Sequence, residues 1–267
     1  RQAIINGNFD VWQRGTSTTT SGVYIADRWL SYDTCSSRTV SRDTDVPNVT
    51  SLYSLKGVYV TGGADKVGVH LYRLEGQQSG RFSGKDVTIS FYIKASVVAG
   101  TLTSSTIRIY YPSALDTFST QELVTTETYT ATSDWTLITK TITLPSVSPV
   151  NSYSIANGMS IYIQCGATDN TTLTVRLAQV QLCAGDVALP FMPKSYEEEL
   201  RACLRYYWTG VVRTINGIMY YSFPVTMRTT PAILTASVGT LANGTKNGFQ
   251  ITHNANENST IVADAEL

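Results

Sequence analysis

The feature that most constrains the fold is an alternation of apolar and polar side chains over residues 87–95, VTISFYIKA. The apolar positions are Val87, Ile89, Phe91, Ile93 and Ala95. Successive side chains of a β-strand point to opposite faces, so a period of two predicts an antiparallel strand with one face in a core. Similar strand-like segments recur at intervals of roughly 10 to 20 residues between polar turn clusters, which predicts a β-sandwich or barrel.

Three further segments alternate in the same way, and their odd-numbered residues are expected to point inward. These residues are Val67, Val69 and Leu71, then Ile107, Ile109 and Tyr111, and finally Met159, Ile161 and Ile163. With residues 87–95, four strands can share one core face. The apolar parity reverses between Leu177 and Val180, which predicts a β-bulge.

Only one segment reads clearly as a helix. Ser195 and Glu198 form an S-x-x-E capping box, and apolar residues follow at helical spacing, so we expect a helix from Tyr196 to about Tyr207. The apolar positions are Leu200, Cys203, Leu204 and Tyr207.

Strand-like stretches follow the helix at 209–223 and 232–238, and Asn-Gly pairs at 243–244 and 247–248 predict a hairpin. We therefore expect residues 1–193 to form the main sandwich and residues 194–267 to form a helix plus a small β unit. A unit of this size has a thin core, so we expect it to take part in oligomerisation.

Composition excludes several classes of partner. Charged residues make up 15% of the chain and the formal net charge is zero, so we expect no nucleic-acid binding. No apolar run approaches the ~20 residues of a membrane-spanning helix, so we expect no membrane insertion. The sequence leaves open an anchoring segment before Arg1.

The common catalytic and metal-binding motifs are missing, which predicts a non-enzymatic protein with no catalytic residues and no metal site. Of the two histidines, His70 lies in an alternating strand, where a sheet-surface residue is the simplest interpretation. The four cysteines lack metal-ligand spacing and are expected to be buried thiols, with a disulfide left open. A pair of carboxylates could still hydrolyse glycosides, and the sequence cannot choose such a pair.

Two N-terminal blocks resemble the opening of a family of phage tail-fibre and virion-surface proteins. They are residues 4–16, IINGNFDVWQRGT, and residues 26–29, ADRW. Later matches keep the family's order and extend over nearly the whole chain. They are residues 87–95, 134–145, 177–185, 190–191, 197–207, 223–228 and 263–267.

The resemblance implies an all-β jelly-roll β-sandwich similar to carbohydrate-binding modules, located on the virion surface after assembly in the host cytoplasm. It also implies a homotrimer and contacts with other virion proteins. Modules with such an opening often hold a structural calcium through an aspartate of the last strand. Residues 177–180, LAQV, lack that aspartate, so we expect no cofactor.

The same alternation predicts a candidate ligand face, because residues between the inward ones must point the other way. Tyrosine rings can cover the apolar face of a sugar while basic and amide groups bind its hydroxyls. The candidate glycan-binding residues are Tyr72, Tyr92, Lys94, Arg108, Tyr110, Tyr162 and Gln164. Tyrosine and arginine are equally common at protein interfaces, so contact with the C-terminal unit or a neighbouring subunit is the alternative.

Three functions follow. The first is a virion structural protein, as tail fibre, spike or capsid-surface module, that binds host or environmental surface glycans. The second is a purely architectural capsid decoration or fibre protein without a ligand. The third is a glycan-degrading enzyme of the tailspike type.

Overall fold

The computed structural model describes residues 2–60, 66–103, 105–168 and 171–267. The chain divides into two compact units, one that runs to Pro193 and includes Leu267, and one that comprises Lys194–Glu266. None of the helices among the described residues is long and apolar enough to cross a membrane.

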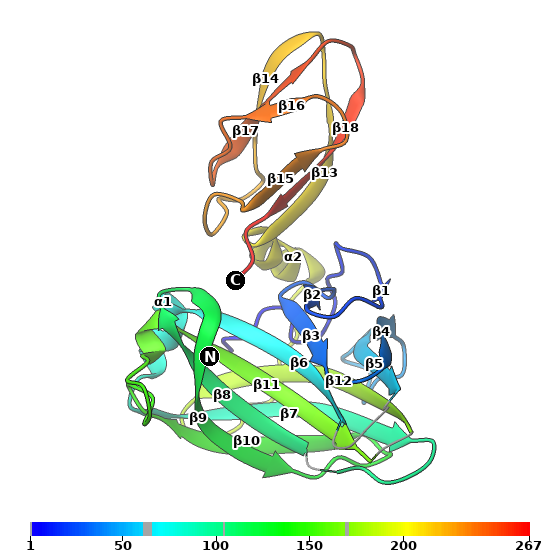
Figure 1. Ribbon diagram of the computed structural model, residues 1–267, viewed down its shortest axis with the longest axis vertical. Helices are drawn as coiled ribbons and strands as arrows, with labels where there is room; N and C mark the ends of the chain where they lie inside the picture. The colour runs from blue at the N-terminus through cyan, green and yellow to red at the C-terminus, as the bar shows by residue number, and fades with distance from the viewer. Residues whose placement is uncertain (1, 61–65, 104, 169–170) are drawn as a thin grey trace. The chain divides into compact units, whose positions relative to one another are not determined.

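The described part of the N-terminal unit forms two six-stranded antiparallel sheets (Figure 1). Sheet A contains, in spatial order, β1 (Ser17–Thr18), β4 (Ser37–Asp43), β5 (Ser54–Val60), β12 (Thr172–Ala184), β7 (Lys85–Val97) and β10 (Thr136–Leu144). Sheet B contains β2 (Val23–Tyr24), β3 (Trp29–Asp33), β6 (Lys66–Glu75), β11 (Gly158–Ala167), β8 (Ser105–Ala114) and β9 (Thr117–Tyr129). From β5 to β12 the chain repeatedly crosses between the sheets, which is jelly-roll connectivity.

A short helix, α1 (Gly76–Ser79), and two 3₁₀ turns, Gly80–Phe82 and Ile155–Asn157, complete this unit. Its core is apolar and lies between the sheets: Phe91 of β7 and Ile109 of β8 are 0% and 1% exposed. The all-β jelly-roll β-sandwich is thus confirmed, as are the inward residues predicted for β7, β8 and β11.

The parity predicted for β6 is wrong. The register places Val69 opposite Gln164 and Leu71 opposite Tyr162, so these two apolar residues lie on the outer face of sheet B. His70, Tyr72 and Leu74 point between the sheets instead. The alternation did not reveal which side of β6 faces the core, because this strand carries apolar side chains at both odd and even positions. Leu71 is fully buried even though it lies on the outer face.

The predicted bulge in β12, the last strand of the sandwich, is confirmed. The pairing of β12 with β7 shifts between Ala178 and Gln181, and Gln179 has a φ of 51°. The two N-terminal blocks also contribute to the core: Phe9 and Trp29 are 0% and 1% exposed, with ring centroids 5.1 Å apart.

The C-terminal unit begins with α2 (Tyr196–Leu204), whose capping box at Ser195 and Glu198 is confirmed. The helix ends earlier than expected because Tyr207 starts a strand paired with Asp264. The described residues then form two three-stranded sheets. One contains β13 (Tyr207–Arg213), β18 (Asn258–Asp264) and β15 (Ile233–Ala236), and the other β14 (Gly217–Ser222), β17 (Gly248–His253) and β16 (Thr240–Ala242).

This second unit has its own hydrophobic cluster. Met227, Ile251 and Ile261 are fully buried, and Trp208 packs against Phe223 with ring centroids 5.5 Å apart. The predicted Asn-Gly hairpin is confirmed, since residues 243–247 join the antiparallel strands β16 and β17.

The expectation of buried thiols holds for Cys165, Cys183 and Cys203, while Cys35 is half-buried. None of the four forms a disulfide among the described residues, and burial raises the pKa of the Cys165 thiol to about 11.

Candidate functional site

Arg108, Tyr110, Tyr162 and Gln164 lie together on the outer face of sheet B. Their strands are adjacent, and Arg108 is the direct cross-strand partner of Tyr162. The rings of Tyr110 and Tyr162 are in contact, with centroids 4.7 Å apart and planes tilted by 53°. This part of the predicted face exists as one surface.

Tyr72 belongs elsewhere, contrary to the sequence prediction. It lies opposite Ile161, points between the sheets and is 0% exposed. Its ring packs on Trp29 at 5.2 Å, and its hydroxyl accepts a hydrogen bond from the backbone N–H of Ile5 at 2.9 Å. Tyr72 is therefore a core residue that anchors the N-terminal segment.

Tyr92 and Lys94 lie on the outer face of the other sheet, which also corrects the prediction. In sheet A, Tyr92 lies opposite Ala178 of β12 and Lys94 lies opposite Arg176 of the same strand. Lys94 Nζ pairs with Asp45 Oδ2 at 2.9 Å. An alternating pattern shows which side of a strand faces the core, but it does not show which sheet the strand joins. The residues of the predicted face are therefore divided between sheets A and B.

Sequence reasoning missed three contributors to the sheet B surface. Tyr32 of β3 lies opposite Val69, Arg73 of β6 lies opposite Ser160, and Gln121 of β9 lies opposite Pro112. Reading β6 with the opposite parity would have assigned Arg73. We call the combined surface the tyrosine face. Its residues are Tyr32, Arg73, Arg108, Tyr110, Gln121, Tyr162 and Gln164.

Hydrogen bonds hold Gln121, Tyr162 and Gln164 of the tyrosine face in place. The Gln121 side-chain amide donates to the Tyr162 hydroxyl at 3.3 Å and to the Phe118 carbonyl at 3.0 Å. Ser160 Oγ donates to Gln121 Oε1 at 2.5 Å, and Thr106 Oγ1 donates to Gln164 Oε1 at 2.9 Å. Burial raises the pKa of Tyr162, which keeps its hydroxyl neutral. This part of the face is thus preorganised.

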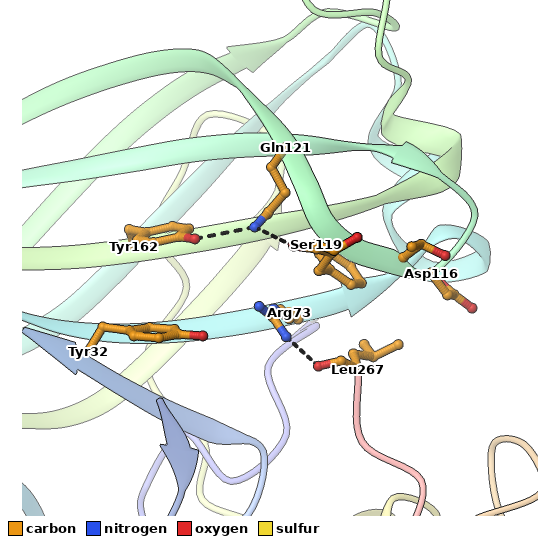
Figure 2. A pocket seen from close by; sticks show the side chains of 9 residues that line it. Tyr32, Arg73, Asp116, Ser119, Gln121, Tyr162 and Leu267 are labelled. Atoms are coloured by element: carbon orange, nitrogen blue, oxygen red, sulfur yellow. Dashed lines mark hydrogen bonds between the residues drawn. The ribbon is translucent and has the colours of Figure 1, made fainter. Parts of the chain in front are cut away.

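A cavity of about 640 Å³ opens on this face beside Tyr162. Figure 2 shows the hydroxyl groups of Tyr32 and Tyr162 directed toward it, with Arg73 beyond the hydroxyl ends of both rings and next to Leu267. The Arg73 guanidinium lies 5.0 Å from the Phe118 ring centroid and donates to the Leu267 carbonyl. Aromatic rings beside hydrogen-bonding groups can hold a ligand with an apolar face and many hydroxyls.

One carboxylate, Asp116, is among the described residues that line this cavity. Its Oδ1 accepts a hydrogen bond from the backbone N–H of Gly76 at 2.8 Å. Glycoside hydrolysis by acid and base requires two carboxyl groups flanking the bond.

His70 is not the sheet-surface residue expected from the sequence. It is 1% exposed, and its ring centroid lies 6.4 Å from that of Tyr59. Neither ring nitrogen has a hydrogen-bond partner among the described residues. Burial, and secondarily the charge of Arg38, lowers the pKa of His70 to about 3, so the ring is neutral at ordinary pH.

The residues near the bulge fit a calcium ion poorly. Gln179 Nε2 lies 2.7 Å from Asn48 Oδ1, 2.7 Å from Thr50 Oγ1 and 2.9 Å from Ser51 Oγ. An amide N–H group therefore occupies the place where a cation would gather these oxygens, and a hard cation prefers carboxylates. In the described part of the chain, no group of three or more His, Cys, Asp or Glu side chains could hold a metal ion.

No family model and no curated protein sequence matches this chain. Among solved structures, a family 11 carbohydrate-binding module from Clostridium thermocellum, in complex with a β-1,3-1,4-mixed-linked tetrasaccharide, has a TM-score of 0.38 and 14% identity, covering 64% of this chain and 96% of that one. The N-terminal cellulose-binding domain of Cellulomonas fimi β-1,4-glucanase C has a TM-score of 0.35 and 20% identity, covering 66% and 97%.

The enzymatically active domain of tailspike protein 4 from bacteriophage CBA120 has a TM-score of 0.40 and 12% identity. The match covers 59% of this chain and only 19% of the tailspike chain.

Proposed function

We propose that the N-terminal sandwich is a non-catalytic binding module for saccharides and that the tyrosine face is its binding surface. The observation that carries the proposal is the contact pair Tyr110 and Tyr162 beside fixed amide and guanidinium groups and an open cavity. Each tyrosine offers an apolar ring surface, and the polar groups replace the water that sugar hydroxyls lose on binding.

Binding without hydrolysis is favoured by the acid content of the cavity. Asp116 is the single carboxylate among the described lining residues, and the backbone N–H of Gly76 already donates to it. A hydrolase would require a second carboxyl group across the cleft. Incubation with the bound glycan, followed by reducing-end analysis, tests this part: released product would contradict it.

The direct test is a glycan-array screen followed by calorimetry with the strongest ligand. Tyr162→Ala removes a stacking ring, so we expect affinity to fall by roughly tenfold or more, corresponding to ~1.4 kcal/mol. Tyr92→Ala is the matched control, because Tyr92 is also a half-buried outer-face tyrosine but belongs to sheet A. Equal affinity for Tyr162→Ala and wild type would rule out the tyrosine face.

We further propose that the module is carried on a phage virion, as a tail fibre, spike or capsid-surface protein, and assembles as a homotrimer with other virion proteins. The support is the sequence resemblance of residues 4–16 and 26–29. Several copies on one particle would multiply a modest single-site affinity. Light scattering tests the trimer, and antibody labelling of purified particles tests the location.

A purely architectural role is the second candidate, and the C-terminal unit favours it. Val211, Ile218 and Tyr220 are 65%, 58% and 76% exposed on β13 and β14, as subunit contacts would be before assembly. A trimer that binds no glycan on the array would favour this role over the saccharide-binding one.

A further inference from the structure

Arg108 is a cation of the tyrosine face without a partner. Its direct neighbours across the sheet are Tyr162 on β11 and Thr126 on β9. Within residues 2–60, 66–103, 105–168 and 171–267, no side chain or backbone group forms a hydrogen bond or ion pair with its guanidinium, and its Nε is buried without an acceptor. The sheet therefore desolvates part of this charge and supplies nothing to balance it, which is unfavourable in the absence of a ligand.

The residues around Arg108 on the outer face are all neutral. They are Thr106, Tyr110, Thr126, Ser160, Tyr162 and Gln164. Arg73, about 12 Å away from strand spacing and rise, is also a cation, and its Nε likewise lacks an acceptor. Arg73 already donates to the Leu267 carbonyl, so Arg108 is the stronger candidate for a charged ligand.

Each arginine on the described strands of sheet A has a partner, and the Arg42 guanidinium lies 4.2 Å from the Tyr53 ring centroid. Arg38 pairs with Asp33 at 2.6 Å, and Arg176 pairs with Asp43 at 3.3 Å. The unpaired guanidinium of Arg108 is therefore specific to the tyrosine face and does not occur on the described strands of sheet A.

We propose that the saccharides bound by the tyrosine face carry a carboxylate and that Arg108 receives it. The planar guanidinium fork matches a carboxylate, and the partly desolvated setting strengthens a charge-assisted hydrogen bond. The sugar ring that bears the carboxylate would lie against Tyr110 and Tyr162, next to Arg108. This inference rests on the proposed saccharide binding and adds the chemical class of the ligand.

The experiment compares one ligand with and without its charge. A glycan array holding neutral, carboxylated and sulfated members identifies the strongest ligand, and carbodiimide-borohydride reduction converts any carboxylates of that ligand to hydroxymethyl groups. Calorimetry then measures native and reduced ligand against wild type, Arg108→Gln and Lys94→Gln. Lys94→Gln is the matched control, because it removes a cation from the outer face of sheet A.

We expect the strongest ligand to be carboxylated and its reduction to weaken wild-type binding by roughly tenfold to a hundredfold. Arg108→Gln should lose a similar factor for the native ligand and almost nothing for the reduced one, whereas Lys94→Gln should bind as wild type. A neutral or sulfated strongest ligand, or equal losses for both ligand forms, would overturn the inference and leave saccharide binding intact. Binding to no glycan by folded protein would overturn the proposed function itself.

Discussion

The outer faces of sheets A and B differ in how their charged side chains are paired, although each carries at least one strand tyrosine, Tyr92 on sheet A and Tyr110 and Tyr162 on sheet B. On sheet A, Lys56, Lys94 and Arg176 pair with Asp43 and Asp45 at 2.9 to 3.3 Å. On sheet B, no carboxylate among the described residues pairs with Arg108. Charged groups that pair with one another stabilise a surface, whereas an unpaired cation beside accessible rings can still bind a ligand.

The largest expected effect lies on the inner side of sheet B and separates a core tyrosine from a ligand tyrosine. Tyr72→Ala should lower the free energy of unfolding by about 3–5 kcal/mol, because it empties space beside Trp29 and leaves the N–H of Ile5 without its acceptor. Tyr162→Ala, on the opposite side of the same sheet, should lower the free energy of unfolding by less than about 1.5 kcal/mol. Urea unfolding monitored by tryptophan fluorescence measures both losses of stability. Equal losses for the two variants would contradict the assignment of the two faces.

A second prediction concerns the inner face and acidity. Because burial depresses the pKa of His70 to about 3, the unfolded chain binds a proton below about pH 6.5 that the folded one does not. Stability should therefore be unaffected by His70 above pH 6.5 and fall by about 1.5 kcal/mol between pH 6.5 and pH 5.

The urea-unfolding free energy across this range measures the effect of His70. His70→Gln should reduce the slope of the unfolding free energy against pH. His253→Gln, which changes the histidine of the C-terminal unit, should leave that slope unchanged. An unchanged slope in His70→Gln would show that the buried ring does not set it.

The third prediction concerns the charge network of sheet A. Partial burial would raise the pKa of Asp45, but hydrogen bonds from Lys94 and Trp135 outweigh it and lower the pKa. Asp45→Asn removes the charge that Lys94 and Arg176 share, so we expect a loss of about 1 kcal/mol after allowance for solvent screening.

Chemical unfolding at low and high salt measures the loss caused by Asp45→Asn. The destabilisation should shrink as salt screens the network, and a loss independent of salt would point to packing instead.

Local patterns predicted the elements of this fold well. The inward residues of β7, β8 and β11, the bulge near Gln179 and the helix start at Ser195 follow from periodicity and capping chemistry, which depend on near neighbours. The candidate face followed less well, because its composition depends on which strands pair. Arg108, Tyr110, Tyr162 and Gln164 came together, but Tyr92 and Lys94 lie in the other sheet.

Two further misses have the same origin. Tyr72 was assigned outward because β6 is apolar at both parities, and only its pairing with β11 reveals the side it faces. Tyr32 and Gln121 were missed because their strands carry weak alternation of their own. Sheet order is a long-range property, and a single sequence contains little information about it.

The smallest effects test the comparison of the two faces most sharply, because they should have opposite signs. Lys94→Gln breaks a paired charge on sheet A and should destabilise the protein by roughly 0.5 kcal/mol. Arg108→Gln removes an unpaired, partly buried charge from sheet B and should leave stability unchanged or raise it by roughly 0.5 kcal/mol, since the desolvation cost disappears. Paired urea-unfolding curves of the two variants in the absence of glycan make the measurement. If both variants lost the same stability, Arg108 would have a partner within the folded chain, and the contrast between a self-satisfied face and a ligand face would fail.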